Sequence, residues 1–357
     1  MITLLDAIAL LLLFLLMLAL GSSIDTVAFK SHFTAPKPLL LGLFLQFIVQ
    51  PPLAITTATL YNLPPLQATA LLIVCSCPGG SMSNIICVIF QADLTLSIAM
   101  TAASSLIAIF MLPANIYLYG GLIESTSTQS SPTHVKIDFQ SILLSTLVVV
   151  AATGLGYKIK TLAHHPTLLY LAKIGVVSGI LVVGNAFRLN LGSDMPVYKA
   201  EPRFIMACAS QILLSLTSGL VCSRLLANLP GPSCMSIATE TSTQNTIIAL
   251  SILGLSLPAS DAAAASVIPL IYGTCNTTTN VLFGLFSWKV MGWSNMSKDA
   301  TVRQMWMSYR DLLKVKPEDF QELDDNGRRK GDSDADSTPL TALTLRPVMV
   351  SPDIIDI

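Results

Sequence analysis

The sequence predicts an all-α polytopic membrane protein. Hydrophobic residues make up 52% of the 357 residues, only 11% are charged, and the mean hydropathy is +0.67. Such a composition is typical of chains that cross a membrane several times. Apolar segments of about 20 residues, the length that a spanning helix needs, recur along residues 1–290. We therefore expect one transmembrane domain over 1–290, followed by a cytoplasmic tail over 291–357 that is partly disordered.

Nine apolar segments are predicted to be the transmembrane helices. The first could instead be a signal peptide, but it lacks a basic start, carries Asp6 and has a longer apolar run than a signal sequence. A retained helix is therefore favoured. After the last span, a short amphipathic helix is expected around 300–314. The nine expected spans are 3–24, 38–61, 66–90, 94–119, 138–157, 167–187, 203–227, 231–256 and 262–288.

The orientation follows from the positions of lysine and arginine, which collect in the cytoplasmic loops of membrane proteins. With the N-terminus outside, the inner loops hold Lys30, Lys37, Lys158, Lys160 and Arg224, and the basic tail is also inside. The Ser/Thr-rich stretch 125–133 is then an outer loop. We expect a multi-pass protein of the plasma membrane with a cytoplasmic C-terminus.

Two of the apolar segments contain breaks. In the third, Pro78-Gly79-Gly80 precedes a polar Ser-Met-Ser-Asn run; in the eighth, residues 239–245 are all polar. Proline removes a backbone donor, and glycine lowers the cost of unwinding. Such breaks expose backbone oxygens and helix ends near the membrane midplane, where transporters bind ions and substrates. The alternative is a simple kink or close helix packing. The matching positions of the breaks favour two inverted repeats, the second to fourth and the seventh to ninth helices.

Glu240 is the carboxylate at the centre of the second break. A charge at this depth costs several kcal/mol unless something binds it. Its neighbours in sequence are hydroxyls and amides, with no basic residue among them. A carboxylate among neutral oxygens suits a small hard cation better than a salt bridge does. Glu240 therefore indicates ion-coupled transport.

Hydroxyl groups on the fourth segment extend this cation site. Ser97 and Thr101 lie one helical turn apart on the same face, and they could complete an oxygen cage with Ser83, Asn84 and Glu240. Alternatively, each hydroxyl bonds back to its own helix. In the ninth segment, Asn276 and its threonine neighbours either line a polar cavity or join helices, and the sequence leaves both open.

The residue types and their positions disfavour enzymes, metal-binding proteins and nucleic-acid-binding proteins. No histidine falls in a predicted span and no paired aspartates face each other, so we expect no enzyme activity. All seven cysteines lie in apolar segments, where they are expected to pack rather than to form disulfides or bind metal. No basic patch indicates nucleic acid, and no motif indicates an organic cofactor. The expected partners are sodium, an organic anion and the lipid bilayer; the oligomeric state is left open.

Four motifs, in this order, resemble the bile-acid:sodium symporter family: Cys-Pro-Gly-Gly-Ser-Met-Ser-Asn (77–84), Asp-Leu-Thr-Leu-Ser-Ile-Ala-Met-Thr (93–101), Glu-Thr-Ser-Thr-Gln-Asn (240–245) and Pro-Leu-Ile-Tyr (269–272). A Gln-Phe-x-x-x-Pro element beginning at Gln46 also fits. The resemblance covers about residues 5–290 and is closest to the nine-helix animal carriers. It implies a core of crossing broken helices (about 38–119 and 203–288) and a panel (about 3–24 and 138–187).

The resemblance also implies two sodium sites and a substrate site. Glu240 would touch both ions, and the substrate would lie between core and panel. The first ion would be held by Ser83, Asn84, Ser97, Thr101 and Glu240. The second would be held by Gln46, Glu240 and Gln244, with main-chain oxygens of Thr241 and Thr243. The substrate residues would be Ser81, Asn245, Asn276 and Thr278.

The function expected on this basis is sodium-coupled uptake of an organic anion, a bile acid or a related steroid-like anion, by alternating access. One alternative is a sodium-coupled carrier of a smaller carboxylate or of a steroid sulfate. A second alternative is a non-transporting receptor or scaffold with the same fold. Such a scaffold would be expected to lose its ion ligands first, yet all the expected side chains are present.

Overall fold

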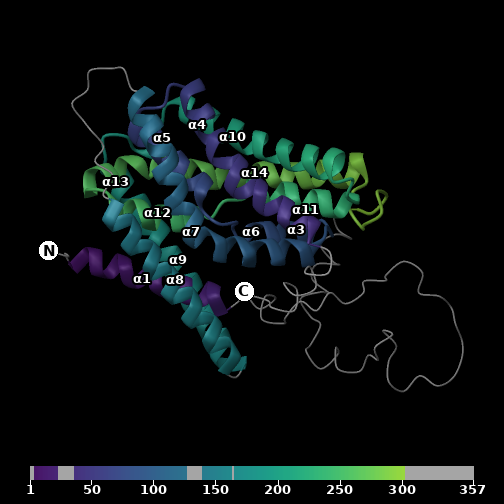
Figure 1. Ribbon diagram of the computed structural model, residues 1–357, viewed down its shortest axis with the longest axis horizontal. Coiled ribbons are helices and arrows are strands. Elements are labelled where there is room, and N and C mark those ends of the chain that lie inside the picture. Colours follow the sequence, from purple (N-terminus) through teal and green to yellow (C-terminus); the bar gives the residue numbers. More distant parts are fainter. Residues whose placement is uncertain (1–3, 23–35, 127–138, 163–164, 302–357) are drawn as a thin grey trace, which may run out of the picture.

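A computed structural model describes residues 4–22, 36–126, 139–162 and 165–301, and most of these residues are helical. Figure 1 shows the helices in their order along the chain. The α-helices are α1 (Leu4–Ser22), α3 (Lys37–Phe44), α4 (Gln50–Leu60), α5 (Pro65–Ser76), α6 (Met82–Ile89), α7 (Leu94–Thr126), α8 (Phe139–Leu162), α9 (His165–Leu191), α10 (Pro202–Val221), α11 (Gly231–Ser242), α12 (Thr246–Ser256), α13 (Ala259–Ala265) and α14 (Val267–Phe286). The short turns are η1 (Leu45–Val49), η2 (Val197–Lys199), η3 (Cys222–Leu226) and η4 (Ser287–Met291).

The described helices are apolar enough for a membrane protein. Four stretches meet both the length and the hydropathy of a membrane span: Lys37–Leu60, Leu94–Ile123, Tyr170–Leu191 and Pro202–Leu226. Three shorter apolar helices accompany them: Ala7–Ser22, Pro65–Ser76 and Thr246–Ser256. The all-α membrane class is thus supported, while the count of nine spans stays a prediction.

The described helices fall on the expected spans. The third and eighth spans are each two helices, α5 with α6 and α11 with α12, as the breaks predicted. The ninth is divided at Ser266 into α13 and α14, which the sequence did not indicate. The helix α7 extends beyond the predicted end at 119. The amphipathic helix expected at 300–314 and most of the loop at 125–133 lie outside the described residues.

The second span bends through a π-helical turn, η1, because two prolines follow it. Pro51 and Pro52 have no N–H to give to the carbonyls of the preceding turn. One of those carbonyls, Phe47 O, instead accepts a hydrogen bond from Asn115 Nδ2 of α7 at 3.2 Å. Both side chains are buried. This bond compensates the broken helix, and the widened turn carries Gln46 toward the centre of the protein.

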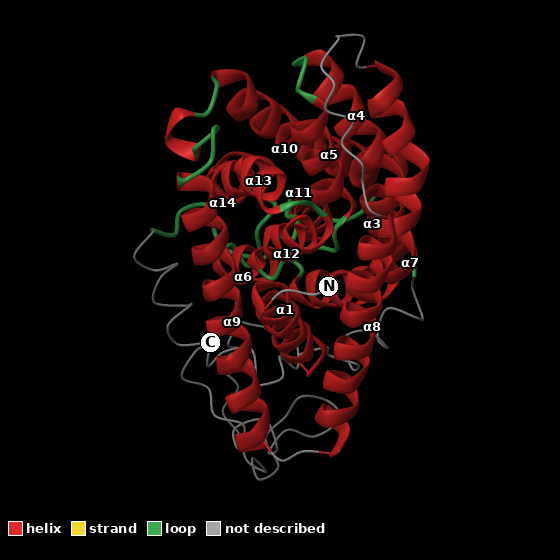
Figure 2. Ribbon diagram, turned by 90° about the vertical axis from the view of Figure 1, so that its left-hand side faces the viewer, coloured by secondary structure: helices red, strands yellow, loops and turns green. Residues whose placement is uncertain are grey.

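Helices α1, α8 and α9 form one layer, and the other helices form a second. In Figures 1 and 2 this three-helix layer lies below the remaining helices and diverges from them along α8 and α9. The packing of α1 on α8 depends on glycine, since a side chain at Gly21 would collide with the main chain of Thr153, and one at Gly156 with that of Leu18. Close backbone approach of this kind is typical of membrane helices.

The two breaks cross and bind each other through their main chains. Asn245 N donates to Pro78 O and Gly80 N donates to Thr243 O, each at 3.0 Å. These bonds form an antiparallel bridge between Gly79 and Gln244, outside any regular sheet. The bridge satisfies backbone groups that water cannot reach at this depth. It fixes the ends of four half-helices around one point.

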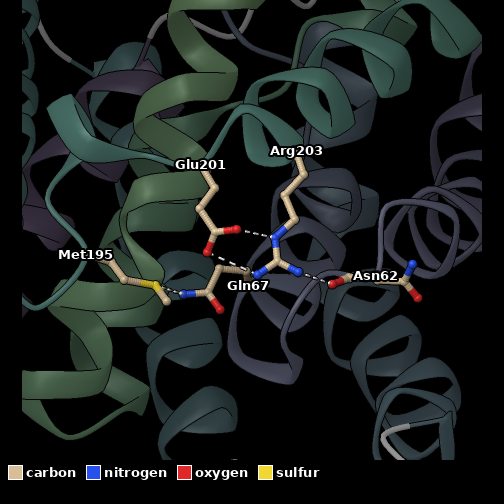
Figure 3. Close-up of polar contacts among 5 residues, drawn as sticks. All are labelled: Asn62, Gln67, Met195, Glu201 and Arg203. Carbon is tan, nitrogen blue, oxygen red and sulfur yellow. Dashed lines mark hydrogen bonds and ion pairs between the residues drawn. The ribbon is translucent and has the colours of Figure 1, made fainter.

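Polar contacts hold together the end of the molecule where α4 meets α5, called here the α4–α5 end. Arg203 at the start of α10 contacts Glu201 Oε2 at 2.7 Å and donates to Asn62 O at 2.8 Å (Figure 3). Deeper in, Asn190 Nδ2 of α9 donates to Ala263 O of α13 at 2.9 Å, and its Oδ1 accepts from Val197 N at 2.6 Å. Asn190 is fully buried. It joins the three-helix layer to the other layer at this end.

The role of Asn115 in the bent second span predicts a large effect of its removal. The substitution Asn115→Leu leaves Phe47 O buried without a donor, and it is expected to lower the free energy of unfolding by about 1–3 kcal/mol. Thermal unfolding of the purified protein in detergent measures this. The matched control is Asn185→Leu, at an exposed position of α9 where little change is expected. Equal melting temperatures of the two variants would contradict the interpretation.

Candidate cation-binding and substrate-binding site

Glu240 lies near the end of α11, beside the crossing point, and is only 1% exposed. Its two carboxylate oxygens accept hydrogen bonds from α7: Oε1 from Thr101 Oγ1 at 2.6 Å, and Oε2 from Ser97 Oγ at 3.0 Å. Within the described ranges no lysine, arginine or histidine pairs with it. The hydroxyls help to solvate the carboxylate but do not neutralise it. Such a carboxylate, surrounded by neutral oxygens, is suited to binding a small cation.

Helix α6 brings further oxygens to this carboxylate, in addition to those of α7. Asn84 Oδ1 of α6 lies 2.8 Å from Ser97 Oγ and 3.5 Å from Thr101 Oγ1, within hydrogen-bond distance of the same two hydroxyls that contact Glu240. Ser83 is fully buried, and its hydroxyl donates to Gly80 O in the break at 2.7 Å. The structure thus joins Asn84, Ser97, Thr101 and Glu240 in one network, with Ser83 attached to the adjoining break.

Glycine is required where the first break passes the carboxylate. A Cβ on Gly79 would collide with Glu240 Oε1, and Gly79 N donates to Ser104 Oγ of α7 at 3.2 Å. At Gly80 a Cβ would lie 3.2 Å from Gln244 O, tighter than an ordinary contact. The pair Gly79-Gly80 therefore serves close approach between the two breaks rather than flexibility. The sequence indicated a break here but not its contact with Glu240.

A second group of oxygens surrounds the other side of the crossing. Gln46 Nε2 donates to Gln244 Oε1 at 2.6 Å and to Cys77 O at 2.9 Å. Gln244 Nε2 donates to Thr241 O at 3.0 Å, while Thr243 O is occupied by Gly80 N. The Thr241 hydroxyl bonds back to its own helix, so only the main-chain oxygen of this residue is directed to the group.

Two oxygen atoms of this second group have no hydrogen-bond partner although they are buried: Gln46 Oε1 and Thr243 Oγ1. An unsatisfied buried oxygen is costly, and it is rare in native proteins unless an ion or water binds it. Both atoms are neutral hard ligands of the kind that a small cation prefers. The donor set therefore fits a cation near Gln46 and Gln244 as well as one beside Glu240.

A cavity of about 740 Å³ opens beside the first group, between the two helical layers. Its polar wall consists of Ser81, Asn84, Thr101 and Ser105, and none of the described residues lining it is basic. The opposite wall is α1 and α9, which are apolar there. The cavity is large enough for a ligand of drug or steroid size. The N-terminus of α6, at Ser81, borders it, and Ile247 in the first turn of α12 lines it too.

The remaining predicted substrate residues lie differently. Asn245 caps α12, accepting from Ile248 N at 3.2 Å, and is adjacent to the cavity only through Ile247. Asn276 is buried, and its Oδ1 accepts from Asn280 Nδ2 at 2.7 Å. Thr278 is exposed, and its hydroxyl donates to Thr274 O of its own helix. Asn276 and Thr278 do not line the cavity.

Comparison with known proteins identifies the family. A sequence model described as the Sodium Bile acid symporter family matches residues 10–193, about half of the chain. The chain belongs to this family. It is an integral membrane protein of a family of transporters.

Three curated relatives illustrate the range of the similarity. The hepatic sodium/bile acid cotransporter of Rattus norvegicus is 28% identical over 75% of this chain and 73% of its own length. The sodium-dependent organic anion transporter of Bos taurus is 29% identical over 72% of this chain and 67% of its own. The P3 protein of Homo sapiens is 31% identical over 72% of this chain and 53% of its own. The description of the family and the names of the first two relatives each refer to sodium.

Proposed function

We propose that this chain is a secondary active transporter that couples the inward movement of sodium to uptake of an organic anion. The observation that carries the proposal is the buried carboxylate of Glu240, which has neutral oxygens from α6 and α7 around it and no basic partner in the described ranges. The names of the relatives support the same class, since they describe sodium/bile acid and sodium-dependent organic anion carriers.

Two sodium ions are proposed as co-substrates, one on each side of the crossing. The first is bound by Glu240, Asn84, Ser97, Thr101 and Ser83. The second is bound beside it, where Gln46 Oε1 is buried without a partner. Glu240 lies at the crossing and contributes a ligand to both ions. The other ligands of the second ion are Gln244 and the oxygens of Thr241 and Thr243.

The two sodium charges exceed the single charge of Glu240, so the loaded site carries a net positive charge. This excess attracts an anion, and the N-termini of α6 and α12 add to the attraction because helix N-termini carry partial positive charge. The cavity has no basic side chain among its described lining residues to do this. Sodium and anion therefore stabilise each other's binding, and this coupling is reciprocal.

The cavity favours a large amphipathic anion over a short carboxylate. Its polar groups gather at Ser81, Asn84, Thr101 and Ser105, and the rest of the described lining is apolar. A short carboxylate would leave most of this wall uncovered. A bile acid or another steroid-like anion, including a steroid sulfate, would cover it. A non-transporting scaffold has no need of a buried, unpaired carboxylate, so that alternative is less well supported.

Movement by alternating access is proposed between a panel (about 3–24 and 138–187) and a core of two inverted repeats (about 38–119 and 203–288), with the tail 291–357 outside both. At the α4–α5 end, Asn190 joins the two layers, whereas further along α9 the cavity separates them.

With the N-terminus outside, the α4–α5 end is the outer one. The conformation is then inward-facing, and the Asn190 bond breaks when the protein opens outward. The plasma membrane is the proposed location.

The proposal predicts that Glu240 cannot be replaced by its neutral isostere. Glu240→Gln keeps the size of the side chain but removes the charge, and it is expected to abolish sodium-dependent uptake. Uptake of a labelled bile acid and a labelled steroid sulfate into vesicles with an imposed sodium gradient measures this. Glu201→Gln is the control, because Glu201 pairs with Arg203 at the exposed α4–α5 end and such pairs contribute little. Undiminished uptake by Glu240→Gln at physiological sodium would rule the proposal out.

The inward-facing assignment predicts that Asn190→Leu shifts the protein toward an outward-open state. The substitution removes the hydrogen bonds of Asn190, and about 1.4 kcal/mol of lost stabilisation corresponds to a tenfold population change. The substitution Val183→Cys places a thiol on the cavity wall. The rate at which a membrane-impermeant thiol reagent, added outside, labels this thiol measures the change. Cys222 and Cys275, which are only half-buried, are first replaced by alanine.

We expect the outside labelling of this cysteine to increase about tenfold in Asn190→Leu. The matched control, Asn185→Leu, changes the same residue type on the same helix but at a position outside the cavity and the Ala263 contact. It should label like the parent protein. If both variants label at the parent rate, Asn190 does not hold the α4–α5 end closed.

A further inference from the structure

One face of α9 forms, together with α1, the apolar wall of the cavity. The lining residues recur every three or four positions, so they lie on a single face of the helix. Glycine occupies this face three times, at Gly175, Gly179 and Gly184. The α9 residues that line the cavity are Ala172, Gly175, Val176, Gly179, Ile180, Val183, Gly184 and Phe187.

The three glycines have different surroundings. A Cβ on Gly175 would collide with Ala19 of α1, so this glycine allows two helices of the layer to pack. A Cβ on Gly179 would lie 3.4 Å from Ile247 Cδ1 and 3.7 Å from Leu16 Cδ1, which are ordinary contacts. A Cβ on Gly184 would meet nothing within 4 Å. Packing therefore explains Gly175, whereas nothing in the packing of the described protein requires glycine at 184.

Gly184 nevertheless incurs a disadvantage. Glycine in the interior of a helix destabilises it by about 1 kcal/mol relative to alanine. What the missing side chain provides at this position is empty volume, since Gly184 lines the cavity opposite the wall formed by α6 and α7. The polar groups of the cavity, Ser81, Asn84 and Thr101, belong to that opposite wall. A ligand whose charged group lies there extends its apolar part toward α9.

We propose that Gly184 is a specificity-determining residue, which sets the size of the apolar body that the cavity accepts. It admits rigid anions with several fused rings, and a side chain at 184 would exclude them while leaving room for smaller anions. This inference rests on the proposed function, because it takes the cavity as the site of the organic anion. On this proposal, the side chain at position 184 decides whether the cavity accepts large anions as well as small ones.

The test is a graded series at this position, Gly184→Ala and Gly184→Phe, in the purified full-length protein. The probes are a steroid sulfate with four fused rings and naphthalene-2-sulfonate with two. Binding is measured as the ligand-dependent rise in melting temperature at saturating sodium, and titration gives an apparent Kd for each probe. Gly154→Phe is the matched control, since a Cβ on Gly154 of α8 also meets nothing within 4 Å and this residue does not line the cavity.

We expect Gly184→Phe to weaken binding of the steroid sulfate at least tenfold and that of the naphthalene probe by less than threefold. Gly184→Ala should lie between Phe and wild type, and Gly154→Phe should behave as wild type. Equal weakening of both probes, or no change for either, would overturn the proposal. So would a wild-type protein that is stabilised by sodium but binds neither probe. A wild-type protein that responds neither to sodium nor to the probes would overturn the proposed function as well.

Discussion

The main-chain contact between the two interrupted helices is the constraint on which the rest of the site depends. Pro78 and Thr243 accept the N–H groups of Asn245 and Gly80, so each break satisfies backbone groups of the other. Neither break would be tolerated alone in an apolar environment, because unsatisfied backbone groups there cost several kcal/mol each. The crossing also brings Glu240 of α11 against Ser97 and Thr101 of α7. Without that approach the carboxylate would have no oxygen neighbours from other helices.

The same contact explains how ions could control the position of distant helices. Any cation that binds Glu240 also bridges α6, α7 and α11, so it stabilises one arrangement of the breaks over others. Ser81 and Ile247, at the starts of α6 and α12, border the cavity, so a change at the crossing changes the cavity wall directly. On the opposite wall, α9 is attached to the other layer through Asn190 at one end and is separated from it by the cavity further along. The proposed ion site and the wall of the cavity therefore share residues at the crossing.

The sequence predicted the parts of this arrangement that break a local rule. A carboxylate such as Glu240 is unusual in an apolar segment, and so is a proline followed by two glycines. The structure brings these two features together at the crossing. Apolar length predicted the approximate positions of the described helices, but not the division of the ninth span at Ser266 or the end of α7. Asn190 and Gly184 could not be predicted, because a polar residue near a helix end and a glycine in a membrane helix are both common, and their roles depend on which helix lies opposite. Asn276 was expected at the cavity, but its helical position aims it at Asn280 instead.

Equilibrium dialysis of the purified protein with radiolabelled sodium tests whether Glu240 binds the ions, and it needs no knowledge of the anion. Two sodium ions are expected to bind per chain of the wild-type protein. About one sodium ion per chain is expected to bind to Gln46→Leu, because this substitution removes a ligand of the second ion only. No sodium ion is expected to bind to Glu240→Gln at the same sodium concentration. Wild-type sodium binding by Glu240→Gln would contradict the account, since the buried carboxylate would then not be the group that binds the ions.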